Sequence, residues 1–283
     1  MQYNVMADTN DDGNVYESGF DNSGSPDKEN DVERVGLKFD KLALNDKKTC
    51  EEMIYTADKD GDNQLMIAII HSMDELAIKM INEASAINLL DARNYDYGHT
   101  AMHLCVMMKR YKVLEELLEK GASRTIVDKK GNTPLHIACK MNDFWSIYLL
   151  TTRNDKYGGV TQDINALNFH GHSFLHLLTK NGADQHSIGY LIRGCGADIN
   201  VKDGLSGRTI LHYAGENNNL ELVKYLIEME ADIEALTYGN ETPLQVTAGR
   251  HNGEVVQAFF CAGADYSVLE GLLEESEESI LNE

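Results

Sequence analysis

Apolar residues in the central part of the chain recur at spacings of three and four positions, which place them on one face of a helix. The clearest stripes are Val113, Leu114, Leu117 and Leu118, and further along Leu222, Val223, Leu226 and Ile227. A shorter apolar run and a turn precede each stripe. The pattern therefore predicts pairs of helices joined by polar segments.

The pairs repeat along the chain, because the same eight-residue pattern starts each of them. Its most complete copy is Gly131-Asn-Thr-Pro-Leu-His-Ile-Ala138. The six copies begin at Gly61, Gly98, Gly131, Gly171, Gly207 and Asn240, which gives spacings of 37, 33, 40, 36 and 33 residues. Regular self-similarity of this kind predicts a repeat architecture.

Each position of the pattern has a physical reason. Glycine supplies the backbone angles of the turn, and Asn240 can replace it because asparagine tolerates them best among other residues. Thr133 and Thr242 are placed to cap a helix whose first residue is Pro134 or Pro243. The second helix of a repeat is expected to end at a Gly-Ala pair. These pairs are Gly121-Ala122, Gly196-Ala197 and Gly263-Ala264.

A period near 33 with Thr-Pro-Leu-His is similar to the ankyrin repeat. The resemblance implies an all-α ankyrin-repeat solenoid of about six helix-turn-helix repeats over residues 56–268, with an extended concave surface suited to protein binding. Residues 1–55 are acidic and poor in apolar side chains, so we expect a disordered regulatory segment. Residues 269–283 are predicted to form a short acidic tail.

Charge and composition narrow the classes of partner. The net charge is −21, from 46 acidic and 25 basic residues, which argues against direct nucleic-acid binding. A negative charge of this size suits a basic protein partner, or it serves only to keep the protein in solution. No apolar run of about 18 residues and no secretory leader is present, so neither a membrane span nor secretion is expected. The five scattered cysteines indicate free thiols in a reducing compartment.

No arrangement of residues indicates catalysis, a metal or a cofactor. His103, His136, His176 and His212 occupy one repeat position. Ligands or bases would be one interpretation, but the repetition favours rings that hydrogen-bond the turn backbone between repeats. Residues 58–63 are similar to a calcium loop, yet Asn63 and Ile69 stand where Gly and Glu are needed. We therefore predict that the protein is not an enzyme.

Individual repeats are similar to those of the IκB/Cactus family, the inhibitors of NF-κB/Rel transcription factors. The similarity covers residues 56 to 268 and keeps the order of the repeats. Its motifs are Asp60-Gly-Asp62 with Leu65 and Ala-Ile-Ile-His71, then Asp128-Lys-Lys-Gly-Asn-Thr-Pro-Leu-His-Ile-Ala-Cys139, Gly207-Arg-Thr-Ile-Leu-His212, and Thr237-Tyr238 with Pro243, Gln245 and Gly249-Arg250.

The resemblance implies a cytoplasmic inhibitor in innate immune signalling that can shuttle to the nucleus. It would bind a Rel dimer, mask the nuclear-localisation segment and block DNA binding. Asp60 and Asp62 would supply carboxylates to that basic segment. The fifth and sixth repeats and the acidic tail would face the DNA-binding region. The partner-binding residues implied there are Tyr238, Arg250, Glu274, Glu275, Glu277 and Glu278.

The N-terminal segment Glu17-Ser18-Gly19-Phe20-Asp21-Asn22-Ser23 resembles the phosphodegron of the family. Its serines are five positions apart where the family has four, and Glu17 replaces Asp. The resemblance implies phosphorylation of Ser18 and Ser23 by a kinase, and then recruitment of a ubiquitin ligase. No lysine precedes Lys28, so Lys28, Lys38 and Lys41 are the candidate ubiquitin acceptors.

Two other functions fit the same array. A nuclear IκB-like coregulator would bind a Rel dimer without being degraded, and it would have no use for the Ser18 and Ser23 segment. A generic ankyrin scaffold or adaptor would bind an unrelated partner, because the fold does not by itself select one.

Overall fold

A computed structural model describes residues 8–9, 15–16, 57–83, 90–152, 163–182, 184–249 and 253–265. The chain divides into two units, Met1–Cys50 and Glu51–Glu283. In the first unit, strands β1 (Asp8–Thr9) and β2 (Val15–Tyr16) pair antiparallel, with Asp8 opposite Tyr16. The disorder predicted for residues 1–55 stays a prediction. The rest of the N-terminal segment and the 269–283 tail lie outside the described residues.

The second unit confirms the predicted all-α fold of six helix pairs. The pairs, within the described residues, are α3 (Gln64–Ile70) with α4 (Asp74–Glu83), α6 (Ala101–Met107) with α7 (Tyr111–Glu119), α8 (Pro134–Lys140) with α9 (Phe144–Thr151), α10 (Phe174–Lys180) with α11 (Gln185–Gly189), α12 (Ile210–Glu216) with α13 (Leu220–Glu228), and α14 (Pro243–Ala248) with α15 (Gly253–Cys261). Helix α11 continues into a π-helical turn, Tyr190–Gly194.

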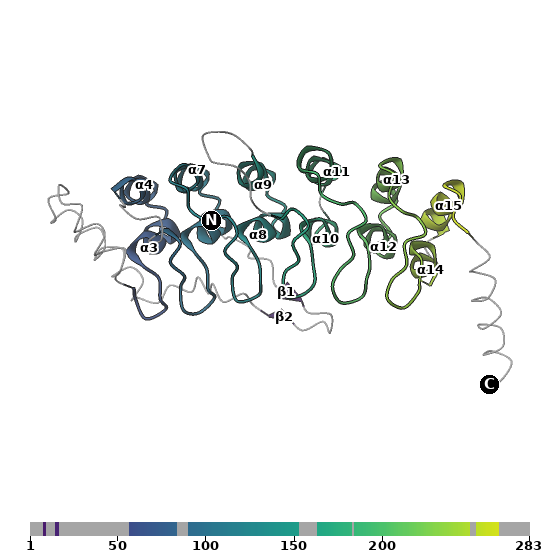
Figure 1. Ribbon diagram of the computed structural model, residues 1–283, viewed down its shortest axis with the longest axis horizontal. Helices are drawn as coiled ribbons and strands as arrows, with labels where there is room; N and C mark the ends of the chain where they lie inside the picture. The colour runs from purple at the N-terminus through teal and green to yellow at the C-terminus, as the bar shows by residue number, and fades with distance from the viewer. Residues whose placement is uncertain are drawn as a thin grey trace. The chain divides into compact units, whose positions relative to one another are not determined.

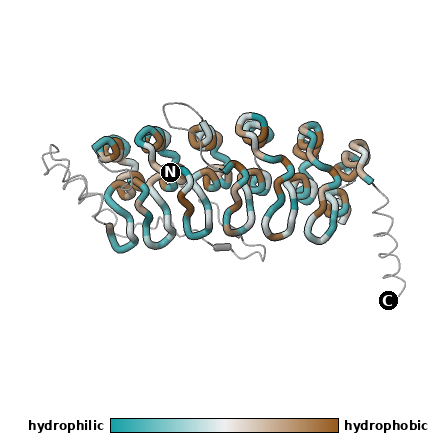
Figure 2. Tube along the Cα trace, viewed as in Figure 1, coloured by the Kyte–Doolittle hydropathy of each residue, from teal (hydrophilic) through white to brown (hydrophobic). Residues whose placement is uncertain are grey.

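The pairs stack side by side in one direction (Figure 1). The first helices contact one another in the order α3, α6, α8, α10, α12 and α14, and the second helices form a parallel outer row. The loops between repeats project at the edge opposite that row. Apolar residues concentrate in the helices and polar residues in the loops (Figure 2). Each repeat therefore buries its apolar face only against its neighbours, as in other solenoids.

The apolar stripes predicted for the second helices lie in this core. Val113, Leu114 and Leu117 in α7 are fully buried. In α13, Leu222, Val223 and Leu226 are buried, but Ile227 is only half-buried because it lies at the edge of that stripe. The buried thiols of Cys105 and Cys139 fill the small core positions that the pattern predicts, and burial raises the pKa of both.

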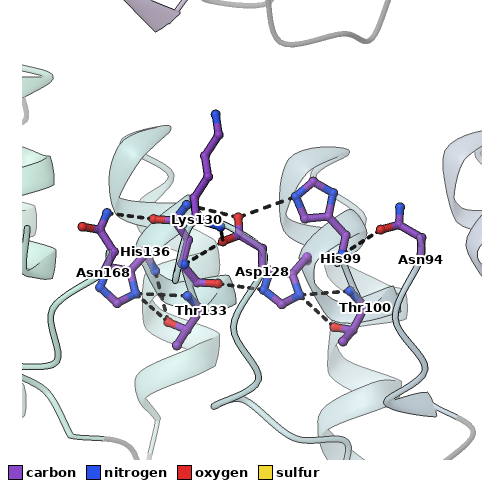
Figure 3. Close-up of polar contacts among 10 residues, drawn as sticks. Asn94, His99, Thr100, Asp128, Lys130, Thr133, His136 and Asn168 are labelled. Carbon is purple, nitrogen blue, oxygen red and sulfur yellow. Dashed lines mark hydrogen bonds and ion pairs between the residues drawn. The ribbon is translucent and has the colours of Figure 1, made fainter. Parts of the chain in front are cut away.

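The repeated histidine joins each of the second to fifth repeats to the repeat that follows it. In α8, the N–H of Thr133 donates to Nδ1 of His136 at 3.1 Å, so Nε2 carries the ring proton and donates to the carbonyl of Ala166 at 3.2 Å. The same two contacts recur at His103, His176 and His212, and Figure 3 shows those at Thr100 and Thr133. The structural interpretation of the histidines is confirmed.

These histidines make the fold sensitive to acid. Burial lowers the pKa of His103, His136 and His212 to about 4 from 6.5, although the bond from each ring to a backbone carbonyl works in the opposite direction. Between pH 6.5 and 4 the unfolded chain therefore binds more protons than the folded one. We expect the free energy of unfolding, measured with urea, to fall as the pH is lowered through this window.

The sixth repeat provides the control. There Gln245 takes the place of histidine, and its Oε1 accepts the Thr242 N–H at 2.8 Å. His136→Gln should keep this cap and remove one titrating ring. The pH dependence of the unfolding free energy should then become shallower by up to about 1.4 kcal/mol per pH unit. An unchanged slope would contradict the assignment.

Candidate protein-binding surface

The loops between repeats are built on short hydrogen-bonded turns. Asp128 Oδ1 accepts the N–H groups of Lys130 at 2.8 Å and of Asn132 at 2.7 Å, and Asn168 Oδ1 accepts those of His170 and His172 at 3.0 and 2.9 Å. Side-chain oxygens of Asp58, Asp203 and Thr237 do the same in their loops. Aspartate, asparagine and threonine favour such turns for this reason.

Hydrogen bonds also join each loop to its neighbour. The N–H of Tyr95 donates to the carbonyl of Asp60 at 3.0 Å, and the N–H of Tyr238 donates to that of Ser206 at 2.8 Å. Between the third and fourth loops, Nδ2 of Asn168 donates to Oδ1 of Asn132 at 2.8 Å (Figure 3). The loops therefore form one connected edge of the molecule.

A row of exposed side chains lies along the tips of these loops. We call it the tip row, and it consists of Asp60, Tyr95, Lys129, Phe169, Leu205 and Tyr238. Its apolar members are 63–72% exposed, with Tyr95 at 64% and Phe169 at 72%. Large apolar side chains with this exposure, repeated along one edge, are typical of a surface that another protein covers.

The turn glycines hold the aromatic tips in place. Gly131 has φ of 76°, and a Cβ atom there would lie 2.5 Å from the ring of Phe169. Gly207 has φ of 71° and would meet Tyr238 in the same way. Only glycine allows both the turn and the close approach. A partner that binds these rings therefore loses little entropy in ordering them.

The first loop carries the acidic end of the tip row. Asp60 is exposed. Asp62 is half-buried, and its Oδ1 accepts a hydrogen bond from Asn94 Nδ2 at 3.0 Å. Burial raises the pKa of Asp62, the Asn94 bond lowers it, and the neighbouring charges of Asp58 and Asp60 raise it further. Asp60 thus faces solvent, whereas Asp62 also joins the first two loops.

The second and third loops share a polar cluster. Tyr97 stacks on His99, with ring centroids 5.4 Å apart, and His99 Nε2 lies 3.7 Å from Asp128 Oδ2. Burial would raise the pKa of Asp128, but hydrogen bonds from His99, Asn132 and Lys130 lower it to about 2. The carboxylate stays charged at neutral pH and fixes the base of the third loop.

The predicted partner-binding residues divide into two groups. Asp60, Asp62 and Tyr238 lie in the first and sixth loops, at opposite ends of the array. Arg250, Glu274, Glu275, Glu277 and Glu278 lie outside the described residues, as do Ser18, Ser23, Lys28, Lys38 and Lys41. Tyr95, Phe169 and Leu205 are exposed loop residues that the sequence pattern did not predict as binding residues. The signal that could have found Tyr95 and Phe169 is their position, directly after the Asn that opens each turn.

The calcium-like segment forms the first of these turns. Asp58 Oδ1 accepts the N–H groups of Asp60 and Asp62, both at 2.9 Å. In the part of the chain that the structure describes, no group of three His, Cys, Asp or Glu side chains is placed to hold a metal ion. No described helix is long and apolar enough to cross a membrane.

Comparison with known proteins identifies the repeats. The model of the family described as ankyrin repeats (3 copies) matches residues 65–165 and 175–269. The solved ankyrin-repeat domain of Bcl-3, described as a unique member of the IkappaB protein family, superposes with a TM-score of 0.66. It is 30% identical, and the match covers 74% of this chain and 90% of that one.

Curated relatives carry the same array. The NF-kappa-B inhibitor alpha of Gallus gallus is 34% identical over 224 residues, 78% of this chain and 69% of its own length. The NF-kappa-B p105 subunit of Gallus gallus is 34% identical over 212 residues, 74% of this chain but 21% of its own length. The mouse B-cell lymphoma 3 protein homolog is 29% identical, and the match spans 46% of it.

These matches extend over most of the described repeats and agree with the resemblance of the individual motifs. Ankyrin-repeat proteins of the IκB family are not enzymes, which confirms the prediction that this chain does not catalyse a reaction. The family match, the curated relatives and the solved structure indicate the same assignment. The chain belongs to the IκB family of ankyrin-repeat proteins.

Proposed function

We propose that the protein inhibits an NF-κB/Rel transcription factor dimer by binding it along the loop edge of the array. The observation that carries this proposal is the tip row, whose exposed aromatic side chains are held by the turns and by the neighbouring loops. Aromatic anchors of this kind dominate the energy of protein interfaces. The net charge of −21 favours a partner with basic segments.

The two ends of the row would contact different parts of the partner. At the first loop, Asp60 would pair with Lys and Arg of the nuclear-localisation segment, while Asp62 keeps the loop in place. At the sixth loop, Tyr238 would contact the basic DNA-binding region. Arg250, and Glu274, Glu275, Glu277 and Glu278 of the tail, would contact the same region. Carboxylates there compete with DNA phosphates for the same basic side chains.

Release would depend on the N-terminal segment. Phosphorylation of Ser18 and Ser23 adds a charge of about −1.5 to −2 at each and creates a site for an Arg-rich reader. A ubiquitin ligase recruited there would modify Lys28, Lys38 or Lys41, and the protein would be degraded. This sequence of events describes a cytoplasmic inhibitor that can shuttle to the nucleus.

The alternative function is a nuclear IκB-like coregulator, which would use the same tip row without being degraded. The match to the Bcl-3 domain supports it, since that domain is 30% identical to this chain, as is the NF-kappa-B inhibitor alpha of Sus scrofa. The two functions differ in the fate of the bound complex after stimulation.

The first loop gives a specific binding test. Asp60→Ala should weaken binding to a Rel-homology dimer about tenfold, because one charged contact is lost. The same change should leave the affinity for a dimer without its nuclear-localisation segment unaltered. Isothermal titration with both dimers measures this. Equal affinities of wild type and variant for the complete dimer would exclude Asp60 from the interface.

A matched variant at Asp62 distinguishes a lost contact with the partner from a change in the stability of the fold. Asp62→Asn keeps an oxygen that can accept from Asn94, so it should preserve the thermal midpoint and weaken binding less than Asp60→Ala.

Association of the wild type should also slow as ionic strength rises, since acidic groups face a basic partner.

The degradation step is tested in stimulated cells. We expect Ser18→Ala with Ser23→Ala to lengthen the half-life of the protein several-fold relative to wild type, measured after protein synthesis is blocked. Ser25→Ala serves as a control in the same segment and should decay like wild type. If the double variant and wild type decay at the same rate, the coregulator becomes the preferred function.

A further inference from the structure

Helix α9 has no charged residue, unlike the outer helices α4, α7, α13 and α15. Its sequence is Phe-Trp-Ser-Ile-Tyr-Leu-Leu-Thr. At the two solvent-facing positions where α7 carries Lys112 and Glu115, and α13 carries Glu221 and Lys224, α9 carries Trp145 and Tyr148. The other two helices are therefore amphipathic, whereas α9 is apolar on both faces.

The exposed face of α9 is part of a continuous cluster of rings. We call it the aromatic patch, and it consists of Phe144, Trp145, Tyr148, His186 and Tyr190. Trp145 is 48% exposed and Tyr148 39%, and their rings stack with centroids 5.6 Å apart. Tyr148 contacts Tyr190 at 6.0 Å, Phe144 contacts Tyr190 at 5.5 Å, and Phe144 contacts His186 at 4.5 Å. The patch thus joins α9 to α11.

Folding does not account for this exposed pair. The core side of α9 is formed by Ile147, Leu149 and Leu150, which are 0–2% exposed. Asp143 caps the helix, and its Oδ2 accepts the hydroxyl of the buried Ser146 at 2.6 Å. Polar side chains at the same two positions of α7 and α13 show that the repeat folds without aromatic residues there.

An acidic hollow adjoins the aromatic patch. It has a volume of about 420 Å³ and lies between the first turns of α11 and α13. Its lining residues are Asp184, Gln185, His186, Asn219, Glu221 and Leu222. His186 belongs to both features. The exposed carboxylates of Asp184 and Glu221 therefore line a hollow that includes His186 of the aromatic patch.

We propose that this outer surface binds a basic amphipathic helix of a second partner protein. The apolar face of that helix would cover Trp145 and Tyr148, as amphipathic helices do in apolar grooves. A Lys or Arg on its flank would enter the hollow, pair with Asp184 and Glu221, and interact with the rings as a cation. The net charge of −21 opposes binding to an anionic membrane.

The aromatic patch and the tip row lie on opposite edges of the array (Figure 1). The outer row of helices carries the aromatic patch, and the loops carry the tip row. A helix bound at the patch would leave the loops accessible, so the second partner could join a complex formed through the loop edge. The inference does not depend on the identity of that first partner.

Trp145 is the only tryptophan in the chain and reports directly on this surface. The experiment titrates the full chain with a synthetic amphipathic helix of leucine and lysine, and with a matched helix of leucine and glutamate. The lysine helix should shift the Trp145 emission to shorter wavelength and bind at least about tenfold more tightly. Anionic vesicles should leave the emission unchanged, and a shift with them would overturn the proposal.

Variants separate the patch from general charge attraction. Trp145→Lys with Tyr148→Glu copies the polar pair of α7 and leaves the net charge unchanged. It should weaken binding of the labelled lysine helix at least about tenfold, measured by anisotropy. Leu205→Ser, an exposed apolar residue of the tip row, should bind like wild type. Undiminished binding by the double variant would overturn the proposal, and its thermal midpoint confirms that it folds.

The charged half is tested separately. Asp184→Asn keeps the cap that this residue forms with the Ser187 N–H, and with Glu221→Gln it should remove most of the preference for lysine over glutamate.

Iodide should quench Trp145 in the free chain at every protein concentration. Protection in the free chain would show that another segment or copy covers the patch, which would overturn the assignment. The double variant Asp184→Asn with Glu221→Gln, and the double variant Trp145→Lys with Tyr148→Glu, should bind a Rel dimer with wild-type affinity.

Discussion

The bond from each repeated histidine to the carbonyl of the next repeat is the constraint on which the array depends. Each ring accepts a hydrogen bond from the N–H at the start of its own helix and donates one to a carbonyl of the following loop. The start of the helix and the spacing of the repeats are therefore fixed together. The ring must be neutral to accept at Nδ1 and donate at Nε2. In the first repeat Met66 takes this position and in the sixth Gln245 does, so the bridges connect the second to the sixth repeats.

This stacking sets the regular arrangement of the loops. Because the repeats are held at a constant spacing, each loop tip reaches the carbonyl of the preceding one, and the turn glycines leave room for the next aromatic ring. The result is an edge of exposed side chains on a rigid backbone. Binding surfaces on repeat proteins are extended for this reason, and their affinity comes from many positions that are ordered before the partner arrives.

The two edges of the molecule differ in character. The loop edge combines acidic, basic and aromatic tips along the whole array, whereas the described part of the outer edge exposes large apolar side chains at α9 and, with Phe260, at α15. The family assignment rests on the repeats and on the overall similarity of the array. It does not explain why one outer helix exposes tryptophan and tyrosine, since neighbouring repeats fold with charged residues there. The exposed pair therefore reflects a requirement beyond folding.

The sequence by itself determined the fold, because each repeat is a local unit: Gly or Asn, then a cap, then an apolar stripe, all within one period. It also indicated that the histidines are structural, because they recur at one repeat position. Only the tertiary structure decided which loop side chains share an edge, that Asp62 accepts a hydrogen bond from Asn94, and that Phe144 of α9 contacts His186 of α11. These depend on contacts between residues about one repeat apart, and stacking sets their register through bonds that no single repeat displays.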